Sequence, residues 1–199
     1  MSYAIIGFGK IGHALAKAFA RKGIEVSVAT TRGPESFAAD AAAIGPTIIA
    51  KTLAEAIKAD IVFLAVRFEA HPDVAKALPS WEGKTVIDAT NLFPVPEELG
   101  GLPSSAIIAK AFTGAKLVKG FNHLIAATLA ADPIVEGGHR VVFLSSDDED
   151  ATAPVAALAK QLGFAPVKLG KLNEGGALVH ARGRTWGQLI FQDLFKKEQ

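Results

Sequence analysis

Residues 2–12 read SYAIIGFGKIG, and this stretch decides the fold. The apolar run before Gly7 is typical of a short buried strand, and the apolar residues after Gly12 recur at helical spacing. The glycines between them form the pattern Gly-x-Gly-x-x-Gly, which predicts a loop that binds a dinucleotide pyrophosphate. In such a loop Gly7 permits a tight turn, Gly9 leaves room for phosphates, and Gly12 lets the helix pack closely on the strand. The loop residues expected to bind the cofactor are Gly7, Phe8, Gly9, Lys10, Ile11 and Gly12.

Strand and helix patterns alternate along the rest of the chain. After the first strand, apolar runs predict strands over residues 24–29, 47–50, 61–66, 85–88, 117–121, 140–144 and 166–169. Helices are expected after Gly12, over residues 34–44, 52–58, 71–78, 124–131, 148–162 and 177–195, and from residue 104 or 105. Residues 91–104 are expected to form a loop. This order predicts an α/β fold of the Rossmann type: a doubly wound, mostly parallel sheet of about eight strands with a short C-terminal helical extension.

Composition narrows the class of protein. The chain has 199 residues, no cysteine and a formal net charge of +1. The lack of cysteine excludes disulfides and thiolate chemistry and is typical of a cytoplasmic protein. Lys196 and Lys197 form the longest basic run, so a nucleic acid partner is not expected. A strand that begins at Ser2 leaves no signal peptide, and no apolar run approaches the roughly 20 residues that span a bilayer, so no membrane partner is expected.

The end of the second expected strand indicates the cofactor. In this fold an acidic residue there binds the ribose 2′-hydroxyl of NAD. This chain has Thr30, Thr31 and Arg32 instead. Two hydroxyls and a guanidinium suit the 2′-phosphate of NADP, which arginine can bind through two charge-assisted hydrogen bonds. The sequence therefore predicts NADP(H), with residues 1–145 as its binding domain.

Five motifs, in order along the chain, resemble one family. They are the glycine loop, VATTR at residues 28–32, LAVRFEA at 64–70, VIDATN at 86–91 and VKGFNH at 118–123. Together they resemble the F-420-dependent NADP oxidoreductases, and the oxidoreductase domain of STEAP metalloreductases is similar too. The likeness is looser over the last 50 residues.

The resemblance implies a hydride passed between the nicotinamide of NADPH and a flavin-like ring stacked against it. Coenzyme F-420, a deazaflavin, is the best-known second substrate of the family, and FMN and FAD are further candidates. By this resemblance, the 2′-phosphate would be held by Thr30, Thr31 and Arg32, the ribose would lie over Ala65, Val66 and Arg67, and the nicotinamide end would approach Ala89, Thr90 and Asn91. Asn122 and His123 would lie where the two rings meet. Arg67 and His123 stand where the family commonly has proline and threonine, at positions where the second substrate should bind.

The sequence offers one candidate acid or base for the reaction. Transfer of a hydride between two rings needs orientation more than a proton shuttle, whereas reduction of a carbonyl needs a general acid. Tyr3 lies in the first strand, away from the expected site. His123 is better placed, although a histidine at a helix entry can equally be bonded to backbone. No histidines have metal-ligand spacing, so no metal site is expected.

Three functions remain open from the sequence. The first is an NADP(H)-dependent oxidoreductase with a flavin-like small-molecule acceptor. The second is an NADPH-dependent reductase of a small carbonyl or imine compound, using His123. The third is an NADP(H)-binding redox sensor without enzymatic activity. Residues 146–199 are expected to complete the sheet and to contribute to the substrate cleft or to a homodimer contact.

Overall fold

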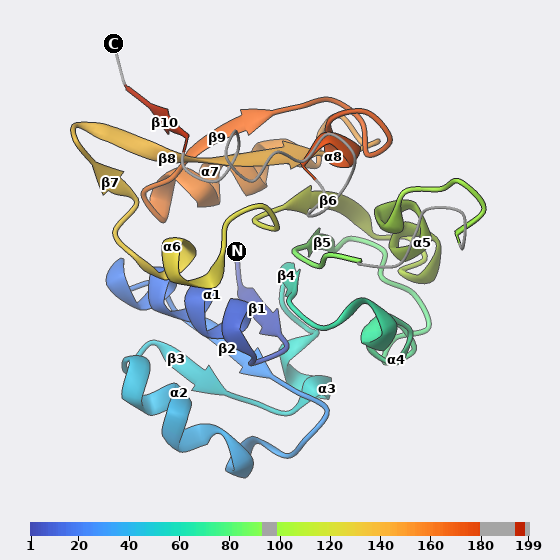
Figure 1. Ribbon diagram of the computed structural model, residues 1–199. Helices are drawn as coiled ribbons and strands as arrows, with labels where there is room; N and C mark the ends of the chain where they lie inside the picture. Colours follow the sequence, from blue (N-terminus) through green and yellow to red (C-terminus); the bar gives the residue numbers. More distant parts are fainter. Residues whose placement is uncertain (93–98, 180–193, 198–199) are drawn as a thin grey trace.

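The structure, a computed structural model, describes residues 1–92, 99–179 and 194–197. Its centre is one twisted sheet (Figure 1). The strands are β1 (Tyr3–Ile6), β2 (Val26–Ala29), β3 (Ile48–Ala50), β4 (Ile61–Leu64), β5 (Thr85–Asp88), β6 (Lys116–Gly120), β7 (Ile134–Val135), β8 (Gly138–Ser145), β9 (Ala165–Lys168) and β10 (Phe195–Lys196). Strands β3, β2, β1, β4, β5 and β6 lie side by side in this order and run parallel. This is the order of the doubly wound dinucleotide-binding fold, so the predicted fold class is confirmed.

Strand β8 extends the sheet beyond β6. It runs antiparallel to β6 and parallel to β9. The two-residue strands β7 and β10 pair antiparallel with its first half. With them the described residues form ten strands rather than about eight. Segments this short carry too little periodicity to be recognised from sequence.

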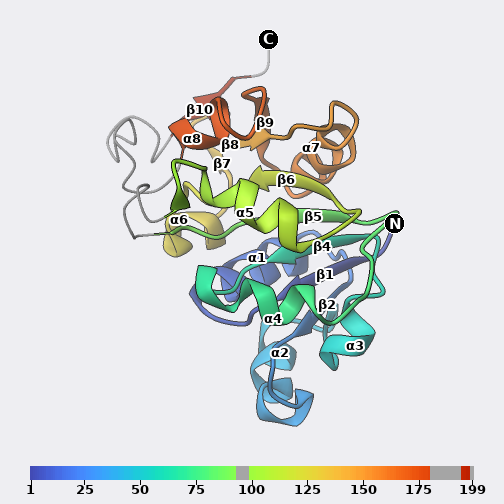
Figure 2. The ribbon, with the colours of Figure 1, turned by 90° about the vertical axis from the view of Figure 1, so that its right-hand side faces the viewer.

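Helices cover both faces of the sheet (Figures 1 and 2). They are α1 (Lys10–Arg21), α2 (Ala38–Ile44), α3 (Leu53–Ala56), α4 (His71–Ala75), α5 (Ser104–Ala111), α6 (Ala126–Ala130), α7 (Thr152–Gln161) and α8 (Gly175–Leu178), with the short 3-10 helices η1 (Pro34–Ser36) and η2 (Phe68–Ala70). Buried side chains of α1, α2, α6 and α7 share one core, and those of α3, α4 and α5 share the other.

The central strands supply side chains to both cores in alternation. In β1, Ile5 lies in the first core, whereas Ala4 and Ile6 lie in the second. In β4, Phe63 lies in the first core and Leu64 in the second. Burial on both faces explains why these strands read as continuous apolar runs. Polar chemistry is therefore concentrated in the loops at the strand ends.

Several helices are shorter than expected, because local contacts interrupt them or make them begin later in the chain. The helix expected over residues 34–44 is divided at Phe37, which has φ −141° and places its ring centre 5.7 Å from that of Phe8. The helix expected over residues 148–162 begins at Thr152, after a turn in which the N–H of Asp150 donates to Asp148 Oδ1. All the longer strands lie within two residues of their expected bounds.

The expectation of a helix over residues 177–195 is confirmed for Ala177 and Leu178 and is wrong at Phe195. Residues 180–193 lie outside the described part of the chain, as do residues 93–98 of the expected loop. Helix α8 ends at Leu178, and Phe195 lies in β10. There Phe195 pairs with Arg140 of β8, whose guanidinium carbon lies 5.8 Å from the centre of the phenylalanine ring. This pairing satisfies backbone groups at a sheet edge, a long-range effect that helical spacing does not reveal.

The segment after residue 145 shares a core with the rest of the chain. Val155 and Leu158 of α7 belong to the same buried cluster as Ile5 of β1. Residue 145 is the last residue of β8. The division into residues 1–145 and 146–199 stays a prediction.

Candidate dinucleotide-binding site

The sheet brings the predicted binding segments together along one edge. Ile6, the last residue of β1, is in register with Ala29 of β2 and with Leu64 of β4. Leu64 is in register with Asp88 of β5, and Asp88 with Lys119 of β6. The loops that follow these strand ends hold residues 7–12, 30–32, 65–67, 89–91 and 122–123. This carboxyl edge is where ligands bind in the doubly wound fold.

The three glycines of the first loop have three different surroundings. Gly7 has φ +103°, and a Cβ there would lie 2.4 Å from the carbonyl oxygen of Ala65. A Cβ on Gly12 would lie 2.0 Å from the carbonyl oxygen of Gly7, so any side chain would force α1 away. At Gly9, by contrast, the described structure has no heavy atom within 4 Å of a Cβ. The loop therefore has a tight turn, a close helix contact and an open cradle at the positions that a pyrophosphate site needs.

The start of α1 supplies hydrogen-bond donors beside this cradle. The helix is 12 residues long, its N-cap Gly9 makes no side-chain cap hydrogen bond, and its first turn holds no acidic residue. The N–H groups of this turn, from Lys10 to Gly12, have no carbonyl partner within the helix. Phe8 and Ile11 pack against the core, so they would offer backbone rather than side chains to a ligand. Donors and helix dipole together fit the oxygens of a pyrophosphate.

The loop after β2 forms a compact polar turn. The hydroxyl of Thr30 accepts a hydrogen bond from the N–H of Arg32 at 3.0 Å and lies 3.3 Å from the carbonyl oxygen of the same residue. Thr31 and Arg32 are exposed at the tip of this turn. A guanidinium and two hydroxyls within three residues fit a 2′-phosphate.

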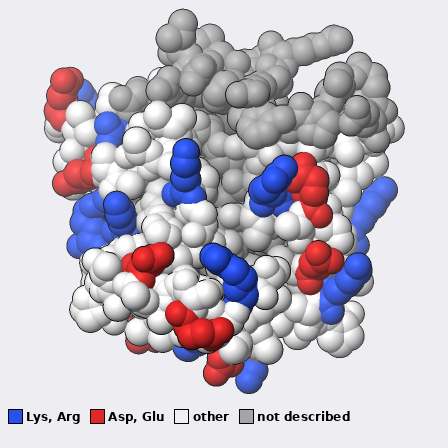
Figure 3. Space-filling view, turned by 60° about the horizontal axis from the view of Figure 1, so that its bottom comes forward, with Lys and Arg blue, Asp and Glu red and all other residues white. Residues whose placement is uncertain are grey.

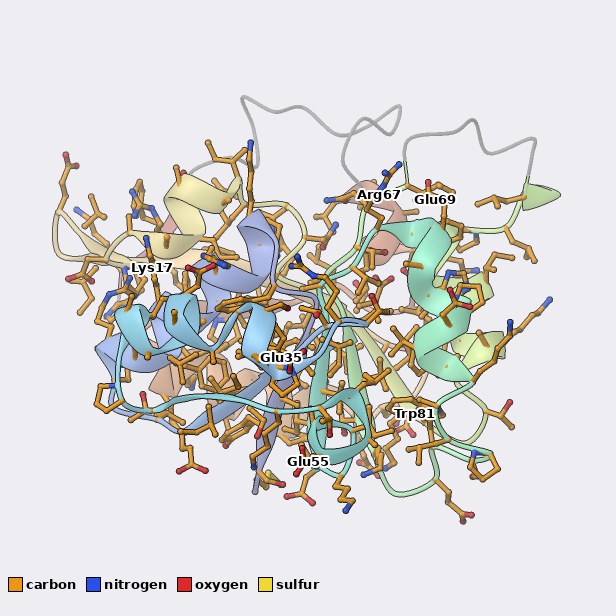
Figure 4. The ribbon with its side chains drawn as sticks, turned by 90° about the horizontal axis from the view of Figure 1, so that it is seen from below. Lys17, Glu35, Glu55, Arg67, Glu69 and Trp81 are labelled. Carbon is orange, nitrogen blue, oxygen red and sulfur yellow. The ribbon has the colours of Figure 1, made fainter. Side chains whose placement is uncertain are left out.

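Glu35 is a neighbour of this turn that the sequence analysis missed. Its carboxylate lies against the backbone of Gly33, where a Cβ would be 2.0 Å from Glu35 Oε1 (Figure 4). Glu35 is the second residue of η1, in a first turn where the helix dipole favours an acid. This placement is the signal that could have identified it. A carboxylate three residues after Arg32 in the chain would oppose a phosphate bound at this turn.

Two asparagines join the ends of β5 and β6. Asn91 Nδ2 donates to the backbone carbonyl of Asn122 at 2.8 Å, and Asn122 Nδ2 lies 3.2 Å from Asn91 Oδ1. Asn122 Nδ2 also donates to the carbonyl of Val179, just after α8, at 3.0 Å. We call the Asn91–Asn122 pair the asparagine clasp. It brings together two segments that the sequence assigned to the nicotinamide end.

The backbone immediately before the clasp adopts an unusual conformation. Phe121 has φ +61° and is fully buried. Bulky residues rarely adopt this left-handed region, and such strain is found where surrounding packing enforces it, often at functional sites. The ring of Phe121 packs edge-on against Phe63 at 5.3 Å and Phe164 at 5.9 Å between ring centres. These contacts fix the turn after β6, from which Asn122 reaches the clasp.

A buried ion pair lies beside the clasp, and the sequence analysis did not select its residues for the site. Lys119 Nζ lies 3.0 Å from Asp88 Oδ2, and the two residues are 1% and 0% exposed. Lys119 also donates to the carbonyl oxygen of Thr90. Asp88 Oδ1 accepts from the N–H and the hydroxyl of Thr90 at 2.9 and 2.7 Å, and Asp88 Oδ2 accepts from Ser105 Oγ at 2.8 Å. We call Asp88, Thr90, Ser105 and Lys119 the Asp88 network.

The Asp88 network holds an ionised carboxylate. Burial alone would raise the pKa of Asp88, but the Lys119 charge and the hydrogen bonds from Thr90 and Ser105 outweigh it and hold the pKa below its usual value. Lys119, within the buried part of β6, was the signal in the sequence. The pairing itself depends on strand register, which adjacent sequence does not specify.

His123 is buried rather than open to the site. It is 2% exposed, its Nε2 lies 3.0 Å from the carbonyl oxygen of Val141, and its ring centre lies 4.9 Å from that of Phe143. Because a carbonyl only accepts, the Nε2–H is the donor. Burial lowers the pKa of His123 to about 4. At neutral pH it is therefore a neutral ring whose N–H is already bonded to backbone. This matches the expectation of a histidine at a helix entry that is bonded to backbone, rather than that of a general acid.

Arg67 and Tyr3 lie at opposite ends of the central strands. Arg67 follows β4 and forms an exposed pair with Glu69, with 3.6 Å between Nε and Oε2 (Figure 4). Such exposed pairs hold side chains weakly. Tyr3 is the first residue of β1, at the other edge, with its ring centre 5.5 Å from that of Phe19. Its expected distance from the site is confirmed.

The face of the molecule shown in Figure 3 has no single dominant charge, because basic and acidic side chains are interspersed on it. Among the described residues, no group of three or more His, Asp or Glu side chains is arranged to hold a metal ion. In the same ranges, no helix has both the length and the apolarity to cross a membrane.

A family model described as NADP oxidoreductase, coenzyme F420-dependent, matches residues 2–92. This segment contains the glycine loop, the turn at Thr30–Arg32 and the end of β5, and it is just under half of the chain. Over this segment the chain is similar to that family, which confirms the resemblance expected from the four motifs that lie within it. NADP is the cofactor that the family description names, in agreement with the turn at Thr30–Arg32.

Solved structures and a curated protein are also similar to this chain. A hypothetical protein from Sinorhizobium meliloti is 38% identical with a TM-score of 0.89, over 100% of this chain and 96% of that one. A protein from Arthrobacter sp. FB24, provisionally assigned as an F420-dependent NADP reductase, is 27% identical with a TM-score of 0.70, over 86% of each chain. Rat (Rattus norvegicus) metalloreductase STEAP3 is 29% identical over 172 residues, which are 84% of this chain and 33% of that protein. The chain thus spans about a third of this curated relative.

Proposed function

We propose that this protein transfers a hydride between NADP(H) and a flavin-like acceptor, with a deazaflavin such as coenzyme F420 as the first candidate. The observation that carries the proposal is the shared carboxyl edge. There an open pyrophosphate cradle, a phosphate-compatible turn and the asparagine clasp follow strands β1, β2, β5 and β6 of one parallel sheet. The family match over residues 2–92 supports the NADP(H) half of the proposal, and the similarity to the Arthrobacter structure supports the deazaflavin half.

The chain's own residues would bind the cofactor at three points. The α1 N–H groups beside Gly9 would bind the pyrophosphate, and Arg32 with the threonines would bind the 2′-phosphate. The edge between Ala89 and the asparagine clasp would support the nicotinamide. When bound, NADPH supplies a hydride from C4 of its nicotinamide. The protein's task is then to place the two rings face to face and to keep them there.

The state of His123 favours this reaction over reduction of a carbonyl. A general acid needs a proton that it can give up near the operating pH. The proton on His123 Nε2 is bonded to the Val141 carbonyl, and burial keeps the ring neutral. We therefore assign His123 a structural role at the end of β6, where it holds the turn that carries Asn122.

An anaerobic titration tests the proposal. NADPH is held constant, and coenzyme F420, FMN, FAD and a panel of small carbonyl and imine compounds are added in turn while NADPH absorbance is followed. We expect NADPH to be consumed with coenzyme F420 or a flavin. With His123→Gln the rate should fall less than about tenfold, well below the 10²–10⁴ that general acid catalysis supplies.

Two results would contradict the proposal. Turnover of a carbonyl or imine alone, with a loss of several hundredfold in His123→Gln, would establish the reductase of small compounds. Tight NADPH binding without turnover of any acceptor would establish the redox sensor.

A further inference from the structure

Burial of the two charges in the Asp88 network costs free energy, so its presence at this site calls for a functional explanation. Removing a carboxylate and an ammonium from water costs several kcal/mol per ion, and buried pairs of this kind commonly add little or nothing to stability compared with apolar side chains. Lys119 and Asp88 are nevertheless almost fully buried, in register on adjacent strands. They lie at the carboxyl edge, directly before the segments assigned to the nicotinamide.

The hydrogen bonds of the network converge on one stretch of backbone. Thr90 is held at its N–H and its hydroxyl by Asp88 and at its carbonyl oxygen by Lys119. Its neighbour Asn91 forms the asparagine clasp with Asn122. The peptide between Thr90 and Asn91 is therefore fixed on both sides.

The network also links residues on either side of the segment between β5 and α5. Thr90 is the second residue after β5, and Ser105 lies in the first turn of α5. Both donate to the carboxylate of Asp88, one to each oxygen. One buried anion thereby joins the end of β5 to the start of α5.

We propose that the Asp88 network is a positioning device that sets the nicotinamide end of the site, with Lys119 as its decisive residue. This inference rests on the proposed NADP(H) function. The segments proposed to bind the adenosine end follow β1 and β2, and β4 separates these strands from β5 and β6, which carry Asp88 and Lys119. Loss of Lys119 should therefore impair ring placement while leaving recognition of the 2′-phosphate intact.

The experiment separates the two ends with two probes. The first is 2′,5′-ADP, which carries the adenosine and the 2′-phosphate but no nicotinamide. The second is NADPH, whose nicotinamide fluorescence reports the surroundings of the ring. Calorimetry measures the affinity of 2′,5′-ADP, and fluorescence titration measures NADPH, for wild type, Lys119→Met and a control variant.

Lys84→Met is the matched control. Lys84 also donates to a carbonyl, that of Ala59 at 3.0 Å, and directly precedes β5 at the opposite edge of the sheet. The double variant Asp88→Asn with Lys119→Met removes the uncompensated charge that the single variant leaves. It should regain much of the thermal stability lost in Lys119→Met but not the ring placement. If Lys119→Met fails to fold, this double variant and Thr90→Val, which removes one hydroxyl, are measured in its place.

In Lys119→Met we expect the affinity for 2′,5′-ADP to stay within about twofold of wild type. The change in nicotinamide fluorescence on NADPH binding should fall by about half or more, because the ring is displaced. Hydride transfer should slow by roughly ten- to a hundredfold, with little change in the KM for NADPH. Lys84→Met should match wild type in each respect.

Two outcomes would overturn the inference while the proposed function stands. One is wild-type NADPH fluorescence and rate in Lys119→Met. The other is an equal loss of affinity for 2′,5′-ADP and for NADPH, which would indicate a general structural role. A wild-type protein that binds neither probe overturns the proposed function itself and the inference with it.

Discussion

Arg32 and Glu35 place opposite charges beside the expected 2′-phosphate, so their substitutions should act in opposite directions. In Arg32→Ala, NADPH affinity should fall by about ten- to a hundredfold, because a pair of charge-assisted hydrogen bonds is lost. NADH affinity should barely change. In Glu35→Gln, NADPH should bind severalfold more tightly, because a like charge is removed. Calorimetry with both cofactors measures these effects, and equal losses of NADPH and NADH affinity in Arg32→Ala would contradict the assignment.

His123 links the site to the acid stability of the fold. Its pKa in the folded protein is about 4, against 6.5 for an unperturbed histidine. Because the unfolded chain binds the proton more readily, stability is complete above pH 6.5 and is lost as the pH falls toward 4. The difference corresponds to about 3 kcal/mol of unfolding free energy. Urea unfolding between pH 7 and 4.5 should show this loss, and His123→Gln should flatten the slope; an unchanged slope would show that His123 is not its source.

Single residues also mark the limit of what the sequence could predict. The absence of an acid at the end of β2 could be read from Thr30 to Arg32, because that rule concerns neighbours in the chain. The partnership of Asp88 with Lys119 could not, since it depends on the register of two strands 31 residues apart. Burial of His123 against Val141 depends on β8, which returns antiparallel beside β6.

At the scale of elements, two glycines of the loop should have separate roles, Gly9 in cofactor binding and Gly12 in folding. Gly9→Val adds a side chain to open space in the extended conformation of the N-cap, so the fold should persist while NADPH binding is abolished. Gly12→Ala instead forces a Cβ against the Gly7 carbonyl. It should lower the unfolding free energy by about 1–3 kcal/mol or more. Thermal unfolding and NADPH calorimetry on both variants test this contrast, and micromolar NADPH binding by folded Gly9→Val would place the phosphates elsewhere.

Elements with strong local signals were predicted well, and those defined by distant partners were not. Strand β5 has the expected bounds, and α3 has the expected Thr52 cap with a reciprocal bond to Glu55. The division between η1 and α2 arises from the contact of Phe37 with Phe8, and β10 arises from its pairing with β8. Both depend on segments far away in the chain.

At the scale of the whole molecule, strand order is the feature that makes a site. Glycine loop, phosphate turn and asparagine clasp are separated by up to 115 residues of sequence, from Gly7 to Asn122. They become neighbours because β2, β1, β4, β5 and β6 are adjacent and parallel. The sequence predicted this edge because the alternation of strands and helices permits few topologies. It did not predict the buried charges that hold the edge in shape.

The central claim, a direct hydride transfer from NADPH to a flavin-like ring, is tested most directly by isotope transfer. The protein is incubated anaerobically with coenzyme F420 and NADPH deuterated at the transferred C4 position, and the reduced deazaflavin is examined by mass spectrometry. Because a deazaflavin accepts hydride at carbon, the label should remain, in an amount equal to the NADPH consumed, and the rate should show a primary isotope effect. Consumption of NADPH without deuterium in the reduced deazaflavin would contradict direct transfer.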